Sequence, residues 1–149
     1  MSARWCAKDD DFDWHCGRRL GALAWCFPDE ASEYADLVLS ALEGQTIIVP
    51  AVWALEVTNA LLVAERRKRI KPPEVRRFVE LLRNLTIIGH SQTVSETVSN
   101  VQPLAREYEL SAYDAAYLDL AIRQGAPLAT LDNKLKTASR SAGIKLFQA

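Results

Sequence analysis

Short apolar runs alternate with longer amphipathic segments from residue 20 to the end of the chain. The β-branched runs at residues 46–49 and 86–89 have the pattern of strands that are buried on both faces. Between them, apolar residues recur at helical spacing, and proline, glycine or capping residues mark most helix ends. The predicted strands span residues 20–27, 46–49, 86–89, 127–131 and 144–147, and the predicted helices span residues 31–42, 51–69, 74–85, 94–109, 112–124 and 133–142.

This alternation predicts an α/β fold with three layers, in which helices cover both faces of a mostly parallel sheet of four or five short strands. The length of 149 residues fits one domain. In parallel sheets of this kind, ligands bind outside the carboxyl ends of the strands. Polar residues that directly follow a strand are therefore the first candidates for a functional site.

Residues 1–19 differ in composition from the rest of the chain. They contain two of the four tryptophans, two of the three cysteines and the run Asp9-Asp10-Asp11, and they show no sustained periodicity. We expect this segment to be irregular, with at most a short extended piece near residues 12–16. The folded domain is expected to span residues 20–149.

The composition excludes several classes of protein. The chain is 49% hydrophobic and 25% charged, as is usual for a soluble globular protein, and its net charge of -1 gives no overall attraction to nucleic acid or membranes. Three cysteines without a CxxC motif favour reduced thiols in the cytoplasm, with a zinc site at His15 and Cys16 as an alternative. The opening residues lack the apolar core of a signal peptide, and no apolar run is long enough for a membrane helix.

Glu56 is an acid in a helix that is otherwise almost wholly apolar, and Asn59 shares its face. A helix that is apolar all round is normally buried, and a buried carboxylate needs a partner or a metal ion. The alternative is that this face reaches solvent and that Glu56 is an ordinary surface acid.

Asp114 and Asp132 stand at the starts of two predicted helices. Asp114 follows Ser111 in the pattern of a capping box, and Asp132 follows the predicted strand at residues 127–131 and can cap the next helix. Thr130 points to the same side of that strand and can support a bound group. Helix capping alone is the alternative explanation for each of the two acids.

The remaining polar residues of the predicted helix at 112–124 are expected to serve folding. Asp119 lies about 140° round the helix from Asp114 and is expected to be a surface acid. Tyr113 and Tyr117 are four residues apart and are expected to be packing residues.

Three acids at element boundaries form a carboxylate cluster if a parallel sheet brings them together. Closely packed carboxylates repel and raise each other's pKa values, and a divalent cation removes this penalty. Oxygen ligands suit Mg²⁺ or Mn²⁺. The sequence contains no nucleophile triad, glycine-rich phosphate loop or dinucleotide fingerprint, so metal-assisted hydrolysis of phosphodiesters is the predicted chemistry.

Five motifs occur in order between residues 22 and 147: ALAWCFPDE, VPAVWALEVTNALL, LSAYDAAYLDLA, LATLDNKL and GIKLF. With these motifs the chain resembles PIN-domain ribonucleases, in particular the VapC-like toxins of bacterial type II toxin–antitoxin systems. The resemblance implies that Glu56, Asp114 and Asp132 bind Mg²⁺ or Mn²⁺, that Asn59 and Thr130 support them, and that a metal-activated water cleaves RNA. It also implies a homodimer and a cognate antitoxin that covers the site.

One expected acid is missing. Members of the resembled family begin with an apolar strand that ends in Asp, and the spacing places this Asp near Arg18. Codons for residues 17–20, read one base later, can spell Asp-Ala-Val-Ser. We therefore hypothesise that residues 1 to about 20 are out of frame. The alternative is that Asp11 or Asp13 replaces the missing acid from a repositioned strand.

The missing acid leaves several functions open. We expect a metal-dependent ribonuclease that is impaired in the chain as given. The alternatives are a catalytically inactive PIN-fold binding module or the product of a frameshifted gene. A DNA-processing nuclease is a third possibility, because it uses the same acids.

Basic residues cluster between the predicted helices at 51–69 and 74–85. The alternatives are a solvated helical hairpin and a rim that guides RNA through phosphate attraction. The cluster comprises Arg66, Arg67, Lys68, Arg69, Lys71, Arg76, Arg77 and Arg83, against Glu65, Glu74 and Glu80, and the first four form the expected RNA rim.

Overall fold

The computed structural model of the chain describes residues 4–7, 40, 44–130 and 132–147. The strand predicted at 20–27, the helix predicted at 31–42 apart from Ser40, and the alternative zinc ligands lie outside these residues. In chain order, the elements are β1 (Arg4–Ala7), β2 (Thr46–Pro50), α3 (Trp53–Arg66), α4 (Pro72–Arg83), β3 (Thr86–His90), α5 (Val94–Glu107), α6 (Ala112–Gln124), β4 (Leu128–Ala129) and α7 (Asn133–Ser141).

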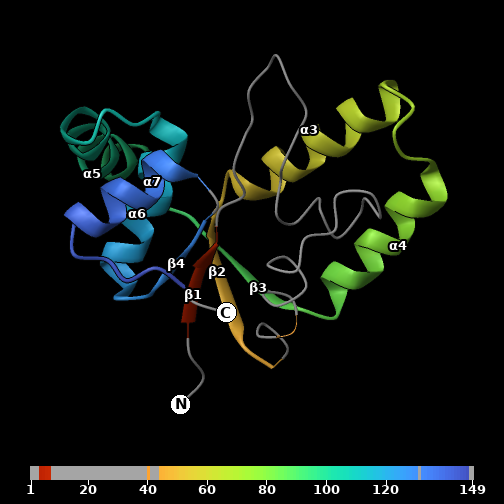
Figure 1. Cartoon of the computed structure of the whole chain (residues 1–149), viewed down its shortest axis with the longest axis horizontal. Helices are drawn as coiled ribbons and strands as arrows, with labels where there is room; N and C mark the ends of the chain where they lie inside the picture. Colours follow the sequence, from red (N-terminus) through yellow and green to blue (C-terminus); the bar gives the residue numbers. More distant parts are fainter. Residues whose placement is uncertain (1–3, 8–39, 41–43, 131, 148–149) are drawn as a thin grey trace.

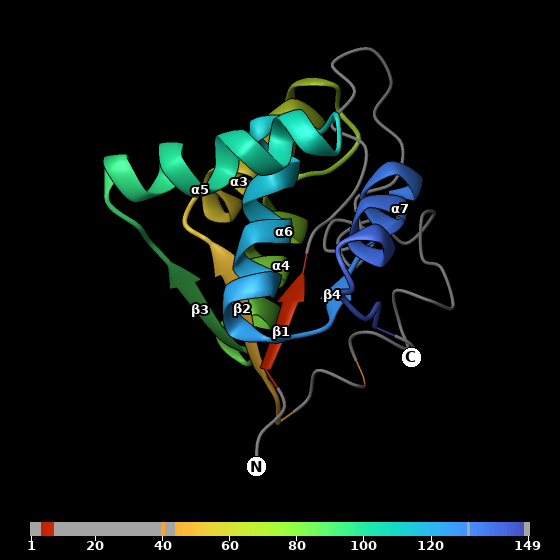
Figure 2. The ribbon, with the colours of Figure 1, turned by 90° about the vertical axis from the view of Figure 1, so that its left-hand side faces the viewer.

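The four strands form one parallel sheet in the order β3-β2-β1-β4. Helices α5, α6 and α7 lie on one side of the sheet, and α3 and α4 lie on the other (Figures 1 and 2). The strand predicted at residues 144–147 is reduced to a single bridge between Leu128 and Leu146. The predicted α/β fold, with three layers and a parallel sheet, is confirmed.

Strand β1 corrects the prediction for the start of the chain. Residues 4–7 were expected to be irregular, but they pair with both β2 and β4 in the middle of the sheet. Four residues are too few to show an alternation of apolar and polar side chains. The strand is fixed by backbone hydrogen bonds to neighbours that are distant in sequence, so the local pattern carries no sign of it.

Strands β2 and β3 have the same kind of sequence but differ in burial. Four of the five residues of β2 are buried, as predicted. Strand β3 was also expected to be buried on both faces, and this is wrong: it forms the edge of the sheet, and Ile88 is half exposed. The β-branched run specifies a strand, but its place in the sheet decides how much of it is covered.

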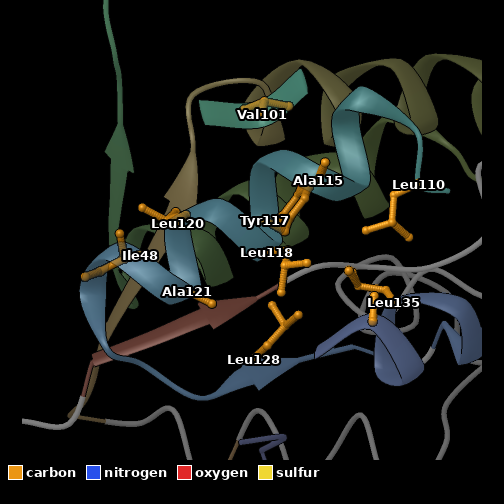
Figure 3. Packing of buried hydrophobic residues seen from close by; sticks show 11 residues of the cluster. Ile48, Val101, Leu110, Ala115, Tyr117, Leu118, Leu120, Ala121, Leu128 and Leu135 are labelled. Atoms are coloured by element: carbon orange, nitrogen blue, oxygen red, sulfur yellow. The ribbon is translucent and has the colours of Figure 1, made fainter. Parts of the chain in front are cut away.

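The largest cluster of buried residues lies between the sheet and helices α5, α6 and α7. Ile48 of β2 contributes to this cluster, whereas its neighbours Ile47 and Val49 face the other side of the sheet and pack with Phe147. Figure 3 shows Leu118 of α6 above Leu128 of β4 in the middle of the cluster. Helix α6 is therefore the central element on its side of the sheet.

Local signals in the sequence explain the ends of α6. Ser111 caps the helix by accepting a hydrogen bond from the backbone N–H of Asp114 (3.0 Å). Gly125 ends it in the left-handed conformation, with a φ of 57°, which glycine adopts without a steric penalty. The chain then turns directly into β4, so α6 runs antiparallel to the strand and begins at the carboxyl edge of the sheet.

Candidate active site

Three elements bring acids to the carboxyl edge of the sheet. Helix α3 starts shortly after β2 ends and carries Glu56 in its first turn. Asp114 lies in the first turn of α6, and Asp132 immediately precedes α7, which follows β4. Leu110, just before α6, and Leu135, in the first turn of α7, belong to one buried cluster (Figure 3).

Glu56 is partly buried and has a hydrogen-bond partner from another helix. The hydroxyl of Tyr117 in α6 donates a hydrogen bond to Glu56 Oε2. Tyr117 is 0% exposed. It was predicted to be a packing residue, and it does pack in the main cluster, but the prediction missed its contact with Glu56. Asn59 lies three residues further along α3 and is also partly buried.

Asp114 is held by the residue that caps α6. The hydroxyl of Ser111 donates to Asp114 Oδ2 (2.6 Å) and accepts from the backbone N–H of Asp114 (3.0 Å). The predicted pairing of the cap residue with this acid is therefore present. Capping fixes the carboxylate at the N-terminus of the helix, where the helix dipole favours negative charge.

Asp132 occupies the capping position that the sequence predicts for it. Its Oδ1 accepts a hydrogen bond from the backbone N–H of Leu135, and its own backbone N–H donates to Thr130 Oγ1 (3.1 Å). Thr130 is 4% exposed. The threonine therefore fixes the backbone that presents Asp132, and capping and metal binding remain compatible roles for this acid.

Asp119 is not the surface acid that the sequence predicted. It is 5% exposed, and its Oδ2 accepts hydrogen bonds from Gln92 Nε2 (2.8 Å) and Arg123 Nε (2.9 Å). Helix α5 packs along α6, and the loop before α5 brings Gln92 over the face that was expected to meet solvent. The packing of α5 against α6 therefore buries Asp119, although its position round the helix predicted exposure to solvent.

The donor chemistry of Glu56, Asp114 and Asp132 fits a hard divalent cation, because carboxylate oxygens are the ligands that Mg²⁺ and Mn²⁺ prefer. The arrangement of these acids in space fits a metal ion less well than their chemistry does. Within the part of the chain that the structure describes, no three histidine, cysteine, aspartate or glutamate side chains are grouped closely enough to hold a metal ion. Arg18, Asp11 and Asp13, which bear on the missing acid, lie outside this part of the chain.

The basic residues that follow α3 are exposed, as either interpretation of the cluster requires. Arg66, Arg67, Lys68 and Arg69 lie at the end of α3 and in the turn before α4. Figure 1 shows this turn at the end of α3 that points away from the sheet. Ten residues separate Arg66 from Glu56, which corresponds to about 15 Å along the helix axis.

The fold agrees with comparisons to known proteins. The PIN-domain family model matches residues 21–140, and the chain therefore belongs to the PIN-domain family. The chain is 31% identical to Ribonuclease VapC3 of Pyrobaculum aerophilum over 108 residues, which cover 72% of this chain and 81% of that protein. The resemblance to VapC-like PIN-domain ribonucleases is confirmed.

A solved structure supports the same fold. The crystal structure of PAE2754 from Pyrobaculum aerophilum matches with a TM-score of 0.63 at 19% identity, over 93% of this chain and 87% of that one. Among the described residues, no helix is long and apolar enough to cross a membrane.

Proposed function

We propose that the chain is a divalent-metal-dependent endoribonuclease of the toxin–antitoxin type. Membership of the PIN-domain family and 31% identity to a protein named as a ribonuclease support this. The observation that carries the proposal is the contact between α3 and α6. Tyr117 follows Asp114 by one helical turn and binds Glu56, which brings acids of two separate elements to one edge of the sheet.

In this proposal, Glu56, Asp114 and Asp132 hold Mg²⁺ or Mn²⁺. When bound, such an ion neutralises phosphate charge and lowers the pKa of a bound water. The helix caps keep Asp114 and Asp132 in place at two helix N-termini, whose backbone N–H groups also favour phosphate. Asn59 shares a face of α3 with Glu56 and can donate to a phosphate oxygen.

The basic segment formed by Arg66, Arg67, Lys68 and Arg69 is proposed to guide the RNA backbone toward this edge. The net charge of the chain is -1, so attraction to phosphate has to come from a local concentration of positive charge. The four residues are exposed and close in sequence. Attraction of this kind does not depend on the RNA sequence, so the acids and their surroundings must select the cleavage site.

The proposed setting is the cytoplasm, with a homodimer and a cognate antitoxin as protein partners. Several large apolar side chains are strongly exposed. Leu55 next to Glu56 is 70% exposed, and Val94 at the start of α5 is 83% exposed. Single exposed apolar residues are normal on a monomer, so the proposal of these partners rests on membership of the family.

A second candidate is a catalytically inactive PIN-fold binding module. It is favoured by the lack of a three-ligand group among the described residues and by Arg18 at the position where the family has an acid. An arginine beside the remaining acids competes with a cation for their charge.

RNA cleavage by the purified chain distinguishes the two candidates. We expect slow cleavage with Mg²⁺, none with EDTA, and at least a roughly hundredfold lower rate for Asp114→Asn, because the substitution removes one ligand charge. Ser95→Ala, an exposed residue of α5, serves as the control and is expected to cleave like the unaltered chain. Cleavage that persists in EDTA or in Asp114→Asn rules out the proposed metal site, and complete inactivity with Mg²⁺ favours the binding module.

A further inference from the structure

Tyr117 is the only tyrosine in α6 that is buried; Tyr113, one turn earlier, is exposed. The ring of Tyr117 lies in the main buried cluster between α6 and the sheet, where Leu118 and Leu120 are also fully buried (Figure 3). Packing of this kind restricts the ring to one orientation. A phenylalanine fills the same volume, so packing alone does not explain why this position carries a hydroxyl group.

The hydroxyl group has a specific partner on a different element. It donates to Oε2 of Glu56, sixty-one residues earlier in the chain. Glu56 is only partly buried, and its side chain has three rotatable bonds that are free to vary in the absence of contacts. The hydrogen bond from Tyr117 therefore holds Oε2 of Glu56 in place. Because both oxygens belong to one planar carboxylate group, this bond also sets the direction of Oε1.

We infer that Tyr117 is a positioning residue, which orients the carboxylate of Glu56 toward a divalent cation at the carboxyl edge of the sheet. This inference rests on the proposed metal-dependent function. A rigid, buried ring that holds the flexible Glu56 side chain reduces the conformational entropy that this side chain loses when the cation binds. Hydrogen bonds to metal-binding carboxylates commonly change metal affinity by about tenfold to a hundredfold.

Binding of Mn²⁺ alone to the full-length chain, measured by titration calorimetry, tests the inference without any need for cleavage. Tyr117→Phe keeps the ring and removes the hydroxyl, and we expect it to weaken Mn²⁺ binding roughly tenfold. Tyr108→Phe is the matched control. Tyr108 packs against the same cluster, and burial together with the adjacent Glu107 raises the pKa of its hydroxyl, but it lies just after the end of α5. We expect Tyr108→Phe to bind Mn²⁺ like the unaltered chain.

A second comparison separates positioning from a general loosening of α6. Asp119→Ala removes a buried acid two residues after Tyr117, so it is expected to lower stability in urea but to leave Mn²⁺ affinity unchanged. Tyr117→Phe is expected to weaken Mn²⁺ binding but to leave stability in urea unchanged. In a chain that carries Glu56→Gln, adding Tyr117→Phe is expected to change Mn²⁺ affinity by less than about twofold, because the oriented ligand is already lost.

The outcomes distinguish this inference from the proposed function. Unchanged Mn²⁺ affinity in Tyr117→Phe, or the same loss with and without Glu56→Gln, overturns the positioning role while the metal site stands. Failure of the unaltered chain to bind Mn²⁺ overturns the metal-dependent function and the positioning role together. Binding of Mn²⁺ that Tyr117→Phe weakens, without any RNA cleavage, supports the positioning role and rejects the nuclease.

Discussion

Asp119 is a charged residue in a part of α6 where both neighbours, Leu118 and Leu120, are fully buried. Its carboxylate accepts hydrogen bonds from Arg123 on the same helix and from Gln92 in the loop before α5. The Arg123 side chain retains 29% of its exposure, so the ion pair lies at the rim of the core. The pair links α6 to the start of α5 without taking part in the proposed metal site.

Removal of this acid is expected to destabilise the fold. Asp119→Ala leaves two donors without their acceptor and is expected to lower the free energy of unfolding by about 2 kcal/mol, measured by urea denaturation. Glu80→Ala is the control, because Glu80 pairs with Arg83 on the surface of α4, where both side chains are more than half exposed. The control is expected to change stability by less than about 0.5 kcal/mol. Equal effects of the two substitutions contradict a buried network at Asp119.

At the same scale, the sequence points to the candidate acids more readily than to their contacts. Glu56, Asp114 and Asp132 are recognisable because each is unusual among its close neighbours, and the caps formed by Ser111 and Asp132 involve residues three apart. The bond between Tyr117 and Glu56 joins residues sixty-one positions apart. No local pattern contains such a contact, since it depends on how α3 and α6 pack.

Helices are predicted more accurately than strands in this chain. The helix predicted at residues 112–124 is observed without any shift, because Ser111 and Gly125 define its ends locally. Strand β1 is missed and β3 is wrongly expected to be buried, because the pairing and burial of a strand depend on its neighbours in the sheet. The sheet edge that carries the candidate site is therefore predictable from the sequence in outline. Whether that edge holds a full set of metal ligands is not.

The start of α5 gives a pH-dependent prediction for one element. The backbone N–H and the hydroxyl of Thr93 donate to Glu96, and these bonds hold the pKa of Glu96 below its ordinary value of 4.5. A lowered pKa means that the stabilisation is present above pH 4.5 and is lost as the pH falls through the lower value of the folded state. We therefore expect Glu96→Gln to remove part of the acid destabilisation.

Urea midpoints measured from about pH 6 down to about pH 3 check this expectation. The unaltered chain is expected to lose more stability over this range than Glu96→Gln does. Glu109→Gln, a change of an exposed glutamate that caps no helix N-terminus, is expected to follow the unaltered chain. Parallel curves for all three proteins show that the cap does not contribute to acid sensitivity.

For the whole molecule, the position of β1 decides how the missing acid is interpreted. The strand lies between β2 and β4 and ends at Ala7. The resemblance to PIN-domain ribonucleases instead expects the first strand to end near Arg18. Asp11 follows Ala7 by four residues in the sequence and lies outside the described residues, so the alternative in which a repositioned strand supplies the acid stays a prediction. The frameshift hypothesis predicts that the natural strand is a different one.

Restoring the expected acid distinguishes these two explanations. If the site lacks a ligand at position 18, Arg18→Asp adds a negative charge where the family has one and raises Mg²⁺-dependent RNA cleavage at least about tenfold. If Asp11 or Asp13 already supplies the ligand, Asp11→Asn or Asp13→Asn lowers cleavage and Arg18→Asp has no effect. Arg19→Asp, which makes the same charge change one position later, controls for net charge. The nucleotide sequence gives an independent check, because the frameshift hypothesis fails if no single-base shift restores an apolar strand that ends in Asp.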